Sequence, residues 1–350
     1  MTIGARVVRR VHPSILWIAV TYKCNSMCSH CYAQNAKDLS CIDPHTISGI
    51  MHLLSYKYIK HIVLIGGEPT LYHDLNSLIA LVKGSCDHVS CVSNGTIFRS
   101  DDTLVSLRQS GLSRIDISIG NEDGFFDISG LCVNRIDAIN RCVNVFGIDN
   151  VSAVMSIGVH NEDRTRKLID MLHKSHVANV AINVVIPPVN QNAYATKESL
   201  SVIAYKIESA YSHIRNNSTL RPLLYLNIPL CLFTLEFVND IFTHGYGVTG
   251  CHVISGDGIV IDPSGNLLPC THWLDIPWGN LHRQYELFES RGSFDRLWSH
   301  GAPRAIAEQL CQYRSYKCID CRLYGTYCLG SCPLLWRVYS ADEEIKGWNR

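Results

Sequence analysis

The sequence predicts an α/β fold in which helices cover a parallel sheet and a small cysteine-rich region follows. Three observations lead to this prediction. Six short β-rich runs alternate with stretches of helical periodicity over the first 214 residues. The composition changes near residue 225, and half of the 16 cysteines lie in the C-terminal third. A chain of 350 residues accommodates one large and one small domain, expected at residues 1–224 and 225–350.

The strands are expected at residues 15–21, 62–65, 89–93, 114–119, 151–159 and 181–186. The helices are expected near residues 43–58, 73–83, 101–110, 131–145, 163–176 and 196–214. Asp43 followed by Pro44 is typical of a helix N-cap with proline at the first helical position. Because strands and helices alternate, the strands should be parallel, with functional groups gathered at their carboxyl ends.

Composition excludes several classes of function. Lysine plus arginine equals aspartate plus glutamate at 31 each, so no net field draws the chain to nucleic acid or to an anionic membrane. No apolar run reaches the roughly 18 residues that a membrane span requires. The cysteines are spaced for metal ligation, which indicates a reducing cytoplasm and not a disulfide framework.

Cys24, Cys28 and Cys31 follow the first expected strand with Cys-x3-Cys-x2-Cys spacing. A 4Fe–4S cluster is usually held by four thiolates. Three thiolates therefore leave one iron free for an exogenous chelator. The alternatives are three reduced thiols without metal, or a zinc site for which His30 is the candidate fourth ligand.

Further candidate residues end the next three strands. The second strand closes in Gly66, Gly67, Glu68 and Pro69, where the two glycines lack a Cβ and would let the backbone approach a ligand. The third and fourth strands end in polar residues, which are Ser93, Asn94 and Ser118. Serine and asparagine are also ordinary turn-formers.

These motifs resemble those of the radical S-adenosylmethionine (SAM) superfamily, including His30 before the third cysteine and Tyr32 after it. The resemblance implies a partial barrel of six strand–helix units, since a full eight-unit barrel needs about 250 residues. It also implies a 4Fe–4S cluster on Cys24, Cys28 and Cys31 that binds SAM. The residues that would contact SAM are Tyr32, Gly66, Gly67, Glu68, Pro69, Ser93, Asn94 and Ser118.

The C-terminal cysteines form two spaced sets. Cys251-x13-Gly265-x4-Cys270 includes an expected hairpin turning at Ser264 and Gly265. The second set is Cys318-x2-Cys321-x6-Cys328-x3-Cys332. Together they resemble the SPASM domain, an extension that carries auxiliary clusters in peptide-modifying radical enzymes. The middle gap of that domain is usually five residues.

The SPASM resemblance implies one or two auxiliary 4Fe–4S clusters. The first would be held by Cys251, Cys270 and Cys332, and the second by Cys318, Cys321 and Cys328. The fourth ligand of the second would be Cys311, Asp342, Glu343 or Glu344, or one iron would stay open. A structural zinc site is the alternative for the second set.

Cys231 allows three interpretations. It precedes Cys251 by 20 residues and could supply the fourth thiolate of the first auxiliary cluster. It could instead be catalytic and return a hydrogen atom to a substrate radical, as a cysteine does in related peptide epimerases. The third interpretation is a small buried apolar residue.

The resemblance implies reductive cleavage of SAM to a 5′-deoxyadenosyl radical that abstracts a hydrogen from a substrate. The expected substrate is a peptide or protein residue, which would be crosslinked, epimerised or dehydrogenated. The expected partners are an electron donor such as flavodoxin or ferredoxin and, because only 14 residues precede the first strand, a separate leader-peptide-binding protein. The alternatives are a dehydrogenase of a small alcohol or sugar, and a non-catalytic iron–sulfur or zinc scaffold.

Overall fold

The computed structural model describes residues 9–26, 28, 30–33, 36, 40–119, 128–158, 162–187, 198–217, 219–274 and 276–345. The strands are β1 (Ile15–Thr21), β2 (His61–Gly66), β3 (His88–Ser93), β4 (Arg114–Ile119), β5 (Val151–Ile157), β6 (Asn179–Val184), β7 (Arg221–Tyr225), β8 (Gly247–Val248), β9 (Gly258–Ile261), β10 (Asn266–Leu268) and β11 (Gly279–Asn280). They form one sheet in the order β11-β10-β9-β1-β2-β3-β4-β5-β6-β7-β8.

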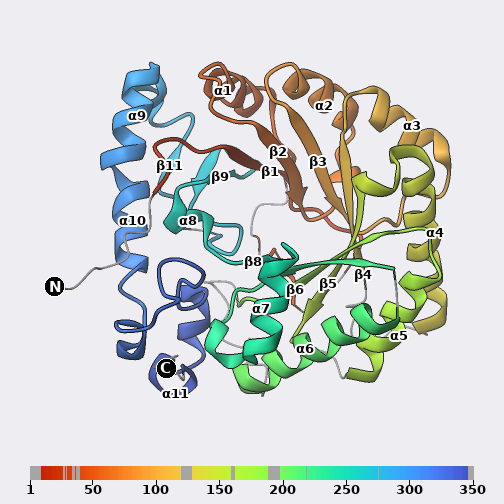
Figure 1. Cartoon of the computed structure of the whole chain (residues 1–350). Coiled ribbons are helices and arrows are strands. Elements are labelled where there is room, and N and C mark those ends of the chain that lie inside the picture. The colour runs from red at the N-terminus through yellow and green to blue at the C-terminus, as the bar shows by residue number, and fades with distance from the viewer. Residues whose placement is uncertain are drawn as a thin grey trace.

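Strands β1 to β8 are parallel and adjacent in chain order. The longer helices are α1 (Pro44–Leu54), α2 (Leu75–Lys83), α3 (Asp101–Gln109), α4 (Ile128–Phe146), α5 (Glu162–His173), α6 (Leu200–Asn217), α7 (Leu235–Thr243), α9 (Arg291–His300) and α10 (Ala302–Leu310). Two short helices are α8 (His252–Ser255) and α11 (Ala341–Glu344). Helices α1 to α6 follow one another around the outside of the sheet (Figure 1). The predicted α/β fold of partial-barrel type is confirmed.

The six predicted strands and six predicted helices are all present; β1 and β4 have the predicted bounds and the others have shifted ends. The sixth strand lies two residues earlier than expected, and residue 159, the expected end of the fifth, lies outside the described residues. Asp43 does cap α1, because its carboxylate accepts the Thr46 N–H at 2.6 Å. Strands β7 and β8 were not predicted, since β7 contains Pro222 and β8 has two residues.

The C-terminal region joins the same sheet. Strand β9 pairs in parallel with β1, and β10 pairs antiparallel with β9, so the predicted hairpin is confirmed. Its turn uses Gly265 at a φ of 75°, where its N–H donates to the Asp262 carbonyl. The expected boundary between residues 224 and 225 falls at the end of β7.

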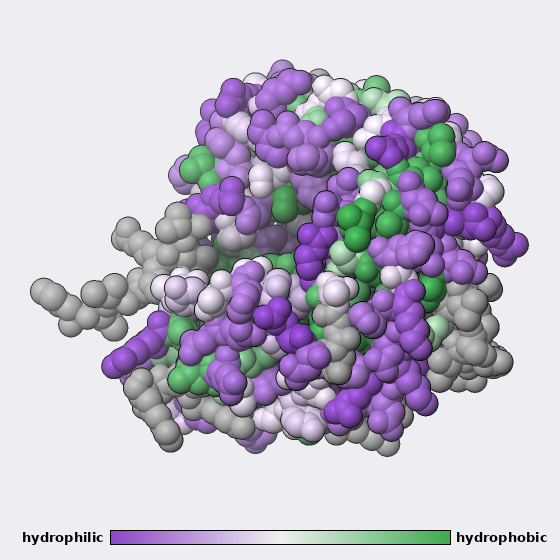
Figure 2. All heavy atoms as spheres, turned by 45° about the vertical axis from the view of Figure 1, so that its right-hand side comes forward, coloured by the Kyte–Doolittle hydropathy of each residue, from purple (hydrophilic) through white to green (hydrophobic). Residues whose placement is uncertain are grey.

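Figure 2 shows a mostly polar face that is hollowed on its left half, with apolar residues visible at depth. In the described parts of the chain, no helix is long and apolar enough to cross a membrane.

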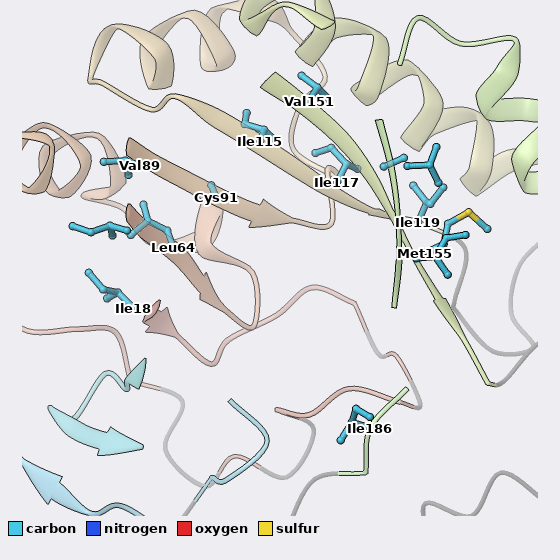
Figure 3. Close-up of a cluster of buried hydrophobic side chains, with 14 of the residues drawn as sticks. Ile18, Leu64, Val89, Cys91, Ile115, Ile117, Ile119, Val151, Met155 and Ile186 are labelled. Atoms are coloured by element: carbon cyan, nitrogen blue, oxygen red, sulfur yellow. The ribbon is translucent and has the colours of Figure 1, made fainter. Parts of the chain in front are cut away.

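The main core lies between the sheet and the outer helices. Ile115, Ile117 and Ile119 of β4 belong to it, and Figure 3 shows them with Ile18 of β1 and Leu64 of β2. Successive side chains of a strand point to opposite faces. The intervening residues of β4, which are Arg114, Asp116 and Ser118, therefore face the inner side of the sheet.

A second apolar cluster covers part of that inner side. It contains Ala19 of β1 with Val63 and Ile65 of β2, and Cys31 and Tyr32 pack against it. The inner face near β1 and β2 thus holds the segment after β1 in place at the carboxyl edge of the sheet.

Candidate active site

The segment after β1 carries the three cysteines of the first motif. Cys24 is exposed, whereas Cys28 and Cys31 are half-buried. Backbone N–H groups face two of the sulfurs, from Ser26 to Cys24 at 3.4 Å and from Ala33 to Cys31 at 3.3 Å. Such donors stabilise thiolates and are a feature of cluster ligation by cysteine.

Gly66 and Gly67 pack against the backbone that leads into this loop. A Cβ on Gly66 would lie 2.0 Å from the Thr21 carbonyl oxygen, and one on Gly67 would lie 2.3 Å from that of Lys23. The Gly67 N–H donates to Thr21 O at 2.8 Å. The missing Cβ atoms were expected to let the backbone approach a ligand; the side that a Cβ would occupy is filled by the chain itself.

Glu68 is fully buried and accepts hydrogen bonds from neighbouring chain segments. Its Oε1 accepts from the Thr70 N–H at 3.2 Å, the Thr70 hydroxyl at 2.5 Å and the Ser93 hydroxyl at 2.8 Å. Its Oε2 accepts from the Asn94 N–H at 2.7 Å. Pro69, also buried, begins a single 3-10 turn after it. The carboxylate therefore ties the end of β2 to the end of β3.

Asn94 continues this network into the cysteine loop. Its Nδ2 donates to Asn25 Oδ1 at 2.7 Å and Ser26 Oγ at 3.2 Å, and lies 4.0 Å from Cys24 Sγ. Its Oδ1 accepts from the Thr96 hydroxyl at 2.7 Å. Three motifs that are far apart in the sequence are thereby joined at one edge of the sheet.

Tyr32 contacts the backbone of Gly66. Its hydroxyl donates to the Gly66 carbonyl at 2.8 Å, and its ring centroid is 5.6 Å from that of His272. Burial, together with the nearby Cys31 thiol, raises the pKa of Tyr32. Ser118 is half-buried on the inner face of β4, two strands away from β2, the strand that Glu68 follows.

Arg135 of α4 is a site residue that the sequence analysis missed. It is only 5% exposed. Burial lowers the pKa of Arg135, and the nearby Cys28 thiol and Glu68 carboxylate act in the opposite direction. A guanidinium therefore lies beside the cysteine loop. Nothing in the helical pattern around Arg135 marks it, because the proximity arises only when α4 packs on the sheet.

The three thiols expected on the first auxiliary cluster, here called the first C-terminal set, are Cys251, Cys270 and Cys332, and they lie near one another. Burial raises the pKa of Cys332, and the thiols of Cys251 and Cys270 add to the effect. Burial raises the pKa of Cys270 to about 11, with a further contribution from Cys251. Cys311 packs with Cys251 and Cys270 around one apolar cluster. Cys311 was expected as one candidate for the fourth ligand of the second auxiliary cluster.

The thiols expected on the second auxiliary cluster, here called the second set, are Cys318, Cys321 and Cys328. They also lie near one another, and Cys231 lies near them. Burial raises the pKa of Cys318 to about 12, and the thiols of Cys328, Cys231 and Cys321 contribute. One of the three interpretations of Cys231 placed it beside Cys251, but the structure places it near this second set. Glu344, one of the acidic candidates, instead accepts the Leu200 N–H at 3.2 Å.

Among the described residues, no three His, Cys, Asp or Glu side chains converge closely enough to hold a single metal ion. A four-iron cluster binds each thiolate at a different iron, so its ligands stand farther apart than those of one ion. The grouped thiols, with N–H donors on their sulfurs, fit such a cluster.

Residues 18–196 match the radical SAM superfamily. The chain belongs to this superfamily. Radical SAM proteins bind a 4Fe–4S cluster and SAM, and both predicted cofactors are confirmed at the level of the family.

Sequence relatives of this radical SAM protein are named as nucleotide cyclases. A probable GTP 3′,8-cyclase from Metallosphaera sedula is 25% identical over 244 residues, which cover 66% of this chain and 75% of that protein. One from Pyrococcus abyssi is 27% identical over 52% of this chain and 60% of that protein. A GTP 3′,8-cyclase from Clostridium perfringens is 22% identical over 74% of this chain and 80% of that protein.

Solved structures with a similar fold include proteins bound to peptides. SuiB from Streptococcus suis with its precursor peptide SuiA superposes with a TM-score of 0.69, at 15% identity, over 96% of this chain and 76% of that one. The protein anSMEcpe with bound AdoMet and Kp18Cys peptide gives a TM-score of 0.63, at 15% identity, over 96% and 93%. These likenesses concern the fold alone.

Proposed function

We propose that this radical SAM enzyme modifies a side chain of a peptide or protein by crosslinking, epimerisation or dehydrogenation. The observation that carries the proposal is the C-terminal thiol region, which resembles the SPASM domain in spacing and joins the sheet through β9. The barrel, residues 1–224, and the SPASM-like region, residues 225–350, are the two proposed units. The bound complexes of SuiB and anSMEcpe support a peptide substrate.

The chain's own residues have distinct tasks in this proposal. Cys24, Cys28 and Cys31 hold the cluster, which with SAM supplies radical chemistry. The Glu68 and Asn94 network fixes the loop so that the cluster cannot shift relative to the sheet.

Recognition of SAM requires partners for its charged methionine part. We assign its carboxylate to Arg135 and Ser118, because a buried guanidinium suits bidentate recognition of a carboxylate. Glu68 Oε2 accepts a hydrogen bond from the Asn94 N–H, and a carboxylate oxygen has room for a second from the SAM ammonium.

The inner face of the sheet is the proposed substrate surface. Arg114 and Asp116 face it as an ion pair at 3.0 Å, followed by Ser118 at the carboxyl end of β4. A charge-balanced surface suits a peptide segment. An external electron donor such as flavodoxin or ferredoxin, and a separate leader-peptide-binding protein, are the proposed partners. The described cysteines form no disulfide with one another, which suits a cytoplasmic location.

Cyclisation of GTP is the second candidate, and the names of the sequence relatives favour it. A nucleoside triphosphate carries several negative charges that require basic partners. On the inner face of β4, Arg114 is already paired with Asp116, which favours the peptide substrate over GTP.

The test begins with protein purified without oxygen and reduced with dithionite in the presence of SAM. We expect 5′-deoxyadenosine to form, and to form faster with a short peptide encoded beside the gene than with GTP. Mass spectrometry should show the peptide altered. Loss of GTP with a cyclised product and an unchanged peptide would replace the peptide proposal by the cyclase. The variant Cys86→Ala, at a half-buried thiol far from the loop, is the control for handling damage.

A further inference from the structure

A short 3-10 turn, Leu230–Leu232, carries Cys231 against the cysteine-rich loop of residues 318–332. Leu230 and Cys328 lie on the walls of one pocket. Because Leu230 directly precedes Cys231, the turn brings the Cys231 backbone near a thiol of the second set.

The same segment is fixed to the loop at a second point. The carbonyl oxygen of Asn227 accepts the Ser331 hydroxyl at 2.8 Å and the Cys332 N–H at 2.8 Å. A small pocket lies between the two segments and is lined by Leu230, Cys328 and Ser331, among others. The contact is therefore anchored by hydrogen bonds.

The thiols of the second set share one neighbourhood with Cys231. The Gly330 N–H donates to Cys328 Sγ at 3.3 Å, and a Cβ on Gly330 would lie 3.7 Å from Cys318 Sγ. The loop that holds these thiols is the one against which the turn of Cys231 packs, so Cys231 approaches the set from a distant part of the chain.

We propose that Cys231 is the fourth thiolate of an iron–sulfur centre whose other ligands are Cys318, Cys321 and Cys328. The inference rests on the proposed function, since it takes the C-terminal thiols to be cluster ligands. A 4Fe–4S cluster held by four cysteines has no open iron. This centre would be coordinatively closed, and Cys231 would be unavailable to donate a hydrogen atom to substrate.

Two of the other candidates for this fourth position are placed elsewhere. Cys311 packs with Cys251 and Cys270, beside the first C-terminal set. Glu344 accepts the Leu200 N–H through its carboxylate. In this proposal the ligand that closes the second centre comes from the start of the SPASM-like region, next to the barrel. Loading of the centre would fasten that segment to the loop.

The experiment counts iron and sulfide in full-length protein purified without oxygen, in wild type, Cys231→Ala, Cys318→Ala and the double variant. We expect each single variant to lose up to about four irons with matching sulfide, or to convert one cluster to a three-iron form visible by EPR. The double variant should lose no more than Cys318→Ala, because both substitutions damage the same centre. Cys231→Ala combined with Cys251→Ala should lose both auxiliary centres.

Three results would overturn the inference. One is unchanged iron and EPR in Cys231→Ala. Another is that the Cys231→Ala/Cys318→Ala double variant loses twice the iron of either single variant, whereas Cys231→Ala combined with Cys251→Ala loses no more iron than Cys251→Ala alone. The third is stoichiometric zinc in place of iron at the Cys231 set. Cys231→Ser, closer in size, repeats the comparison if the alanine variant does not fold, and Cys86→Ala should keep wild-type iron.

The proposed function is measured separately. Wild-type 5′-deoxyadenosine formation depends on the cluster at Cys24, Cys28 and Cys31. If the wild type forms 5′-deoxyadenosine and Cys231→Ala keeps its iron, the ligand assignment is rejected and the enzyme assignment stands. If the wild type forms no 5′-deoxyadenosine but the iron counts follow the expected pattern, the enzyme assignment is rejected and the ligand assignment stands.

Discussion

Replacing Glu68 by glutamine should destabilise the protein even without SAM. Oε1 accepts three hydrogen bonds, from two groups of Thr70 and from Ser93, and Oε2 accepts one from the Asn94 N–H. A glutamine would keep its single oxygen at the three donors. Its amide NH₂ would then face the Asn94 N–H. Because both groups are hydrogen-bond donors, the Asn94 N–H would lose its acceptor.

The magnitude follows from the hydrogen bond that is lost. A hydrogen bond to a charged group contributes about 1.5–3 kcal/mol, and a buried N–H left without an acceptor costs about 1–3 kcal/mol. Since Glu68 is fully buried, solvent cannot replace the lost acceptor. We expect the free energy of unfolding to fall by about 3 kcal/mol.

Urea unfolding of protein kept free of oxygen, followed by tryptophan fluorescence without SAM, measures this change. Glu289→Gln is the matched control, because Glu289 is exposed and its replacement should change the free energy by less than about 0.5 kcal/mol. An unchanged midpoint for Glu68→Gln, together with weaker SAM binding, would refute the tethering role and leave only the ligand role that the sequence suggested.

Three further predictions concern the same edge of the sheet. Gly67→Ala should disturb the cysteine loop and lower the iron bound there, because its Cβ would lie 2.3 Å from the Lys23 carbonyl oxygen. The control Gly84→Ala, whose Cβ would lie 3.7 Å from the nearest atom, should leave the iron content unchanged. Cys28→Ala should abolish 5′-deoxyadenosine formation while the auxiliary iron remains, and wild-type cleavage would disprove the loop assignment. Arg135→Gln should weaken SAM binding by roughly tenfold or more, as one charge-assisted hydrogen bond is lost; equilibrium binding with unchanged affinity would remove Arg135 from the site.

The sequence alone determined the features that depend on near neighbours in the chain. The spacing of Cys24, Cys28 and Cys31 is a local property, and it indicated cluster ligation without any knowledge of the fold. The strands were predictable for a similar reason, because a buried strand is a continuous apolar run between turn signals. The hairpin at Gly265 required only local turn chemistry.

Tertiary structure decided what depends on distant segments meeting. Glu68 finds Ser93 because parallel strands β2 and β3 end at one edge, and the number of donors on its carboxylate cannot be read from the chain. Arg135 reaches the cysteine loop only through the packing of α4. One interpretation of Cys231 joined it to Cys251, its nearer neighbour in sequence, but the turn at Leu230–Leu232 lies against the loop of Cys328. Separation along the chain does not fix distance in space once strands and turns have folded the chain back on itself.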